Sequence, residues 1–182
     1  MKKFILTSFL FCNIIFFINP TYAQSYTTAI GGIWGGSVAS GISFKHFLNT
    51  GMDKNNNGFE IIALSFFKGI LAYGLYERQS HIIINNENSG LSYYYGLGGH
   101  FGNFEPTANY CKTDITGRYT KIGIDGVIGV EYELEHLFTS YNVPFVISAD
   151  VKPFYDLVGS GCGGIWTFGI SIRYILGGFS LK

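Results

Sequence analysis

The chain has 182 residues with 12 basic and 12 acidic side chains, so its formal net charge is zero when histidine is neutral. The absence of a basic excess or a basic run excludes a nucleic-acid-binding function. Charged residues make up 13% of the chain, about half of the share that is usual in a soluble domain, whereas aromatic residues reach 18% and glycine numbers 25.

Residues 1–23 have the layout of a secretory signal peptide. A short basic region of two lysines precedes the mostly apolar residues 4–17, and Ala23 ends the segment with a small side chain. This order predicts cleavage between Ala23 and Gln24. The apolar run is too short for a membrane anchor helix and is interrupted by a polar residue. The mature domain is therefore expected to span residues 24–182, a length that suits one domain.

The longest alternating pattern of the mature chain lies in residues 119–134. Every second residue from Ile122 to Leu134 is apolar apart from one glycine, and the intervening set is small or charged apart from one valine. Alternation at period two predicts an extended strand with one apolar and one polar face. Strands of soluble proteins usually have about five or six residues, whereas a tilted strand needs roughly nine to eleven residues to cross a bilayer.

Seven further segments show strand patterns between polar or glycine-rich turns, and helical periodicity is not seen in the mature chain. Residues 58–67 and 69–78 alternate poorly, so the facing of these two strands stays open. Few charges, alternating strands and no apolar segment long enough for a spanning helix together predict a membrane β-barrel. The expected strands are residues 26–36, 41–48, 58–67, 69–78, 91–101, 119–134, 143–155 and 165–175.

The polar faces of the clearest strands decide which side of the sheet forms the interior. Aromatic side chains on the outside of a soluble barrel would expose a large apolar surface to water. The same side chains inside would overfill an eight-stranded barrel, whose interior holds only packed side chains. We therefore expect an all-β, antiparallel, eight-stranded transmembrane up-and-down barrel with paired charges in its lumen. The predicted luminal polar network is His100, Asp125, Glu131, Glu133, Asp150, Lys152 and Arg173, with Lys45, Glu60 and Glu77 as further candidates.

Two cysteines fall in long connections of the predicted barrel. An even number of strands places both chain termini on one side of the barrel, so the connections after the fifth and seventh strands share the other side. Cys111 lies in the first of these and Cys162 in the second. Two cysteines on one face of an exported protein suggest a disulfide, and the sequence leaves open whether they are bonded or free. The expected interfacial aromatic residues are Trp34, Tyr132, Trp166 and Tyr174.

The histidines do not form a recognisable catalytic or metal site. A lipid-modifying barrel enzyme needs a nucleophile beside a histidine and an orienting acid. His46 is expected to face lipid, and His81 and His136 fall in predicted connections, the first within residues 79–89. His100 is interpreted as a member of the luminal network. No His/Cys cluster has the spacing of metal ligands, and the glycine-rich runs do not open a helix, so no metal, phosphate or other cofactor site is expected.

Several segments carry a family resemblance when they are taken in chain order. They are residues 40–48 (SGISFKHFL), 74–79 (GLYERQ), 92–102 (SYYYGLGGHFG), 123–135 (GIDGVIGVEYELE), 148–153 (SADVKP) and 169–174 (GISIRY). From residue 41 to 174 the chain resembles the small outer-membrane β-barrel proteins common in the Bacteroidetes group, which are related in architecture to the OmpX and OmpW barrels. The resemblance implies an eight-stranded barrel in the cell outer membrane without a catalytic motif. Members usually end on an aromatic residue that the assembly machinery reads, a signal expected here in residues 179–181.

The leading functional hypothesis is an outer-membrane barrel with a structural or loop-mediated interaction role and no catalysis. Residues 102–118 and 156–163 are the expected interaction loops, because binding commonly resides on loops held by a rigid scaffold. The alternatives are a narrow porin-like conduit for small solutes, which needs a gap in the luminal packing, a lipid A-modifying enzyme, and a secreted soluble ligand-binding barrel. The expected partners of a monomer are outer-membrane lipid and the barrel assembly machinery, with the extracellular partner left open.

Overall fold

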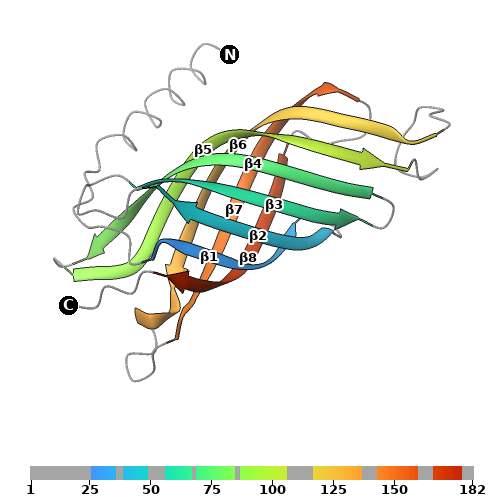
Figure 1. Cartoon of the computed structure of the whole chain (residues 1–182). Coiled ribbons are helices and arrows are strands. Elements are labelled where there is room, and N and C mark those ends of the chain that lie inside the picture. Colours follow the sequence, from blue (N-terminus) through green and yellow to red (C-terminus); the bar gives the residue numbers. More distant parts are fainter. Residues whose placement is uncertain are drawn as a thin grey trace, which may run out of the picture.

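The computed structural model describes residues 26–35, 39–48, 56–66, 69–84, 87–105, 117–136, 143–159 and 166–177. These residues form a closed antiparallel barrel of eight strands, in which β1 pairs with β2 and with β8 (Figure 1). The predicted eight-stranded up-and-down barrel is therefore confirmed. The elements are β1 (Thr28–Gly35), β2 (Ala39–Phe47), β3 (Asn56–Phe66), β4 (Gly69–Ile84), β5 (Glu87–Phe104), β6 (Tyr119–Glu133), the 3₁₀ helix η1 (Leu134–His136), β7 (Phe145–Val158) and β8 (Trp166–Gly177).

The barrel has two ends that differ in their connections. β1 begins and β8 ends at one end, which we call the terminal end, and the β4–β5 and β6–β7 connections lie there as well (Figure 1). The β5–β6 and β7–β8 connections lie at the opposite end, which we call the far end. Cys111 and Cys162 belong to these two connections but lie outside the described residues, so their bonding stays a prediction. Residues 1–23 and 179–181 also lie outside the described residues, and so do the signal peptide and terminal signal expected there.

The β4–β5 hairpin is longer than the sequence pattern indicated. The expected connection at residues 79–89 is wrong, because Gln79 pairs with Tyr94 and the ladder continues, across a register shift, to Ile84 opposite Glu87. His81 therefore lies within β4, and its side chain is buried. The run Asn-Asn-Glu-Asn-Ser at residues 85–89 resembles a loop in composition. At Glu87 and Asn88, backbone pairing with Ile84 and Ile83 overrides that local preference.

Burial alternates along the strands and separates the two faces of the sheet. Apolar side chains such as Ile128 and Leu97 lie on the outer face, whereas the intervening positions point into the barrel. The structure also gives the facing of β3 and β4, which the sequence left open: Glu60 and Glu77 point inward and are fully buried. Among the expected interfacial aromatic residues, Trp34 and Trp166 lie on the outer face near the far end, and Tyr132 and Tyr174 lie near the terminal end.

The interior is layered along the barrel axis. One apolar cluster lies at the terminal end and consists of Tyr26, Ala29, Phe47, Val146 and Ile175. Charged side chains follow on the same strands, for example Lys45 on β2 and Arg173 on β8. A second apolar cluster lies farther toward the far end, mainly on β1 to β5. It consists of Ile33, Ala39, Ile62, Leu64, Leu71, Tyr73, Leu75, Tyr94 and Val127.

Glycines on the inward face let neighbouring strands and luminal side chains approach each other closely. A Cβ atom added to Gly98 of β5 would lie 2.8 Å from the Cα atom of Leu75 and closer still to the carbonyl oxygen of Gly74. A Cβ atom added to Gly74, which is exposed on the outer face, would meet nothing within 4 Å. The two glycines belong to the same strand pair. Substituting each of them therefore distinguishes the effect of close packing at Gly98 from the general destabilising effect of glycine in a strand.

We predict opposite effects of alanine at these two positions. Gly98→Ala should destabilise the barrel by about 1–3 kcal/mol, because the added methyl group forces β4 and β5 apart. Gly74→Ala should stabilise it by roughly 0.5–1 kcal/mol, since alanine loses less backbone entropy on folding. Denaturant unfolding of both variants in detergent micelles checks the prediction, and equal effects of the two substitutions would contradict it.

Candidate functional site

The candidate site is the buried cluster of charged side chains around Arg173. Alternation along β8 places Ile172 and Tyr174 on the outer face and therefore directs Arg173 inward. Arg173 lies opposite Gly31 of β1 and Val146 of β7, so its neighbours in the sheet add no competing polar group. Its side chain is 0% exposed, and a guanidinium group in such a place must be paired.

The guanidinium group of Arg173 is hydrogen-bonded to four side chains from four other strands. Nη1 donates to Glu131 Oε2 at 2.8 Å and Nη2 donates to Glu60 Oε1 at 2.7 Å. Nε donates to Ser43 Oγ at 2.8 Å, and Nη2 also donates to Ser148 Oγ at 3.2 Å. The planar fork of arginine suits this arrangement, because its donors point in fixed and different directions. One side chain therefore ties β2, β3, β6 and β7 to β8.

Glu131 of β6 is the main acceptor of the cluster. Its Oε1 atom accepts hydrogen bonds from the Tyr26 hydroxyl at 2.6 Å and from Gln79 Nε2 at 2.7 Å. Its Oε2 atom lies 3.4 Å from Lys45 Nζ and accepts from Arg173. Burial raises the pKa of the Tyr26 hydroxyl well above its usual range, and the negative charge of Glu131 raises it further. Tyr26 therefore keeps its proton and serves as a donor to the carboxylate.

Lys45 of β2 connects this cluster to a second charged pair. Its Nζ atom lies 2.9 Å from Glu77 Oε2 and 3.9 Å from the centre of the Tyr94 ring, a distance that suits a cation–π contact. The Tyr94 hydroxyl donates to Asp150 Oδ2 at 3.1 Å. Asp150 in turn forms a buried ion pair with Lys152. Tyr94 thus bridges the two groups of charges with its ring on one side and its hydroxyl on the other.

A separate polar group lies nearer the far end, around His100 of β5. The Nδ1 atom of His100 is 2.9 Å from Asp125 Oδ2, and its Nε2 atom is 3.1 Å from Asp156 Oδ1. Lys121 Nζ donates to Asp156 Oδ2 at 2.8 Å. The imidazole ring also contacts the ring of Phe154 edge to face at 5.8 Å between centroids. With a carboxylate at each ring nitrogen, His100 is held as a link between β5, β6 and β7.

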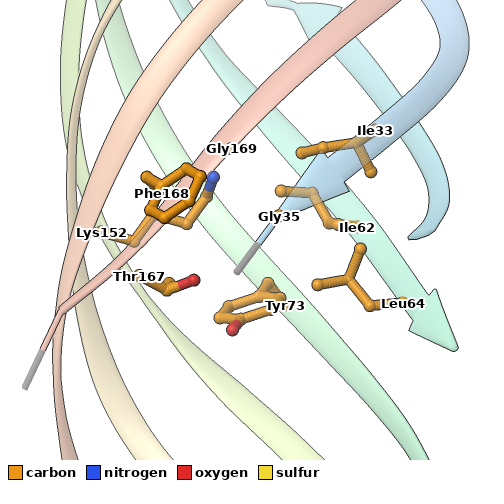
Figure 2. A pocket seen from close by; sticks show the side chains of 9 residues that line it. All are labelled: Ile33, Gly35, Ile62, Leu64, Tyr73, Lys152, Thr167, Phe168 and Gly169. Carbon is orange, nitrogen blue, oxygen red and sulfur yellow. The ribbon is translucent and has the colours of Figure 1, made fainter. Parts of the chain in front are cut away.

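A small pocket lies near the far end, and Figure 2 shows the side chains that line it. The space between them is about 220 Å³ when the adjoining open solvent is included, and its walls are mostly apolar, with the Lys152 side chain among them. On β3 the lining stops at Ile62, and the next inward residue toward the terminal end is Glu60 of the charged cluster. The fully buried cluster therefore forms the floor of the pocket. The lining residues are Ile33, Gly35, Ile62, Leu64, Tyr73, Lys152, Thr167, Phe168 and Gly169.

The seven residues that the sequence singled out all point inward and are buried, but they do not form one group. Glu131 and Arg173 share the central cluster with Lys45, Glu60 and Glu77. Asp150 and Lys152 form the pair reached through Tyr94, and His100 and Asp125 lie nearer the far end. Glu133 is buried on β6 two residues beyond Glu131. The sequence reasoning missed Tyr26, Ser43, Gln79, Tyr94, Ser148, Lys121 and Asp156 as members of these groups.

The missed residues had a usable signal in some cases. Lys121 shares the parity of Asp125 and Glu131 on β6, and Tyr94 shares that of His100 on β5. Asp156 was expected in a loop, but β7 continues to Val158 with a register shift opposite Ile122. Within the described ranges no group of three or more His, Cys, Asp and Glu side chains is arranged to hold a metal ion, and no helix is long and apolar enough to cross a membrane.

His46 lies on the outer face, away from these groups. Its Nδ1 atom is 2.8 Å from the Thr28 hydroxyl, and its ring is nearly parallel to that of Phe44, with an interplanar angle of 4°. The Phe59 ring lies 5.4 Å from it on the neighbouring strand. The imidazole group is thus part of an aromatic cluster near the terminal end, where it links the beginning of β1 to the end of β2.

We predict that the central cluster depends strongly on Arg173. Arg173→Met keeps much of the side-chain volume but leaves Glu60 and Glu131 without their main partner, and should cost about 3–5 kcal/mol of unfolding free energy. Arg118→Met is the matched control, because Arg118 pairs with Glu105 in a salt bridge whose side chains are 72% and 48% exposed. Pairs of that kind contribute about 0–1 kcal/mol. Denaturant titration of both variants tests this, and similar losses in the two would contradict it.

Comparison with known proteins places the fold but not a family. No protein-family model matches the sequence, and no curated protein matches it. Among solved structures, the chain is similar to the N-terminal β-barrel domain of OprF from Pseudomonas aeruginosa. The TM-score is 0.52 and the sequence identity is 17%, over 84% of this chain and 98% of that domain. At this level of identity, the likeness shows a shared β-barrel fold.

Proposed function

We propose that this chain is an outer-membrane β-barrel with a structural or loop-mediated interaction role and no catalysis. The observation that carries the proposal is the distribution of side chains over a closed barrel. Leu97, Ile70 and Ile128 on the outer face are 75%, 65% and 64% exposed, whereas the buried charged side chains lie inside the barrel between two apolar clusters. In water this apolar outer surface would favour association between molecules, whereas in a bilayer it would contact the apolar lipid chains. Closure also leaves no unpaired sheet edge, as a bilayer requires.

Two likenesses support the same proposal. The OprF domain with the similar fold is a β-barrel domain, which supports the barrel architecture. The sequence segments between residues 40 and 174 resemble the small Bacteroidetes barrels of OmpX and OmpW architecture. On this basis the terminal end faces the periplasm and the far end faces outward. Membrane lipid and the barrel assembly machinery are the proposed partners of a monomer.

The filled interior favours a scaffold over a conduit for solutes. The central cluster around Arg173 occupies the middle of the lumen, and the apolar cluster with Tyr26 and Phe47 follows at the terminal end. The described pocket ends on the charged cluster. We therefore propose that the interaction role lies in the two loops expected at residues 102–118 and 156–163, which a rigid barrel would hold in place. The first residues of each range belong to strands, because β5 continues to Phe104 and β7 to Val158.

A substitution on the outer face distinguishes lipid from water as the surrounding medium. Ile128 lies in the middle of β6, and we predict that Ile128→Arg lowers barrel stability in lipid by about 2–4 kcal/mol. Asn103→Arg, on the outer face near the far end of β5, should cost about 0–1 kcal/mol because charges are tolerated near the interface. Folding into lipid vesicles, followed by denaturant titration, measures both effects. Equal tolerance of the two arginines would indicate a water-exposed surface and contradict the proposal.

Location and conductance test the proposal directly. After membrane fractionation, the protein should appear in the outer-membrane fraction and migrate differently on a gel before and after boiling, as a folded detergent-resistant barrel does. Purified protein in planar lipid bilayers should show no steady conductance. A soluble protein without a mobility shift would contradict the membrane assignment. Steady conductance in a folded membrane protein would instead favour the conduit over the scaffold.

A further inference from the structure

The central cluster contains more buried acids than buried bases. Glu60, Glu77 and Glu131 supply three carboxyl groups, whereas Lys45 and Arg173 supply two positive charges, and all five side chains are at most 1% exposed. A net negative charge among fully buried side chains is costly unless a counter-charge offsets it. The cluster as a whole therefore lacks one positive charge.

The surplus is located at Glu60 and Glu77 by the acceptor atoms that have no donor. Glu131 accepts from several side chains, whereas Glu60 Oε2, Glu77 Oε1 and Gln79 Oε1 have no hydrogen-bond donor within the part of the chain that the structure describes. Glu77 Oε2 is better placed, 2.9 Å from Lys45 Nζ. The three unpaired atoms are oxygens, which can accept hydrogen bonds or bind a cation but cannot donate to each other.

The geometry of the β3–β4 pair brings these oxygens together. Glu60 lies opposite Leu75, and Glu77 lies opposite Gly58, so the two glutamates are diagonal neighbours on the inward face. Their carboxyl groups interact directly with each other. Gln79 is the next inward residue after Glu77 on β4. Two carboxylates in contact repel each other unless a positive charge lies between them.

We propose that Glu60 and Glu77 together bind one monovalent cation inside the barrel. The ligand is a single positive charge held by carboxylate oxygens, and its source is either a proton or an alkali metal ion. As a proton, it resides on one carboxyl group, which donates a hydrogen bond to the other carboxylate. As a sodium or potassium ion, it is bound by both carboxylates and the Gln79 amide oxygen. Either one brings the central cluster to neutrality.

The surrounding groups restrict where this charge can sit. Lys45 from β2 pairs with Glu77 Oε2 and Arg173 from β8 pairs with Glu60 Oε1, so each of these positive charges is already bound to one oxygen of the pair. Glu131 from β6 is occupied by donors from four residues. Tyr94 from β5 presents its ring to Lys45 and its hydroxyl to Asp150. Three further groups face the site: Ser43 on β2 donates to Glu60, Tyr26 before β1 donates to Glu131, and the Lys152 charge on β7 acts on Glu60 but is paired with Asp150. The Glu60–Glu77 contact is left as the place for the cation.

The inference does not depend on where the barrel resides, so it can fail while the proposed function stands. Glu77→Gln replaces one carboxyl group by a neutral group of the same shape and removes the need for the cation. This variant should fold and keep its resistance to denaturant. Glu131→Gln removes a carboxylate that is already paired and should be clearly less stable. Glu105→Gln, at an exposed salt bridge outside the lumen, is the control for loss of a glutamate as such.

The test for a proton uses infrared difference spectra of the full-length protein folded in detergent, at neutral pH, with choline chloride as the added salt. If a proton is bound, the wild-type protein shows the carbonyl band of a protonated carboxylic acid. The band shifts in heavy water, disappears in Glu77→Gln and remains in Glu105→Gln. A carboxylic acid band that persists unchanged in both Glu77→Gln and Glu60→Gln would overturn the assignment to this pair.

The test for an alkali metal ion applies if the wild-type protein shows no such band. Denaturant unfolding is then compared in sodium, potassium and choline chloride at equal ionic strength. A higher unfolding midpoint in sodium or potassium that is lost in Glu77→Gln identifies a metal ion at the site. If the protein shows neither the band nor a cation-dependent midpoint, the proposal is wrong.

Discussion

The structure depends on the pairing of charges in an interior that has little room for water. Eight strands enclose a lumen that side chains fill, so each luminal charge has to find its partner among residues of other strands. Arg173 meets this requirement for the centre of the barrel, with hydrogen bonds to Ser43, Glu60, Glu131 and Ser148. Its fork specifies the relative positions of β2, β3, β6, β7 and β8. The apolar clusters on either side fit around this arrangement.

The alternation of residue types predicted the number of strands and the facing of most of them. On β6, the set from Lys121 to Glu133 follows a period of two and is small or charged apart from Val127, because all of its members point into the closed barrel. The low share of charged residues and the aromatic positions favoured a membrane barrel over a soluble barrel. Side-chain periodicity is a local property of the chain. It predicts the facing of a strand correctly wherever one face of the sheet is apolar and the other is polar.

The parts that the sequence did not predict depend on contacts between distant strands. The continuation of β4 and β5 through residues 79–93 rests on the backbone ladder between them, which composition does not report. The division of the luminal residues into a central cluster and a His100 group depends on height along the barrel. Height follows from strand tilt and register, including the shifts near Ile122 and His81. The role of Tyr94 could not be predicted, because the sequence places this tyrosine on the polar face but does not show which charged side chains lie beside it.

The long sequence separations within the Arg173 cluster have a consequence for the order of folding. Arg173 bonds to Ser43 across 130 positions and to Glu60 across 113 positions of the chain. Arg173 reaches its partners only after β8 has arrived beside β1, so Glu60 of β3 and Glu131 of β6 lack this partner until the last strand is in place. The cluster therefore lowers the free energy of the closed barrel and leaves an intermediate that contains only the early strands without this stabilisation. Interactions absent from the transition state act mainly on the unfolding rate. If closure is the last step, the hydrogen bonds of the guanidinium group lower the unfolding rate of the closed barrel and leave its folding rate largely unchanged.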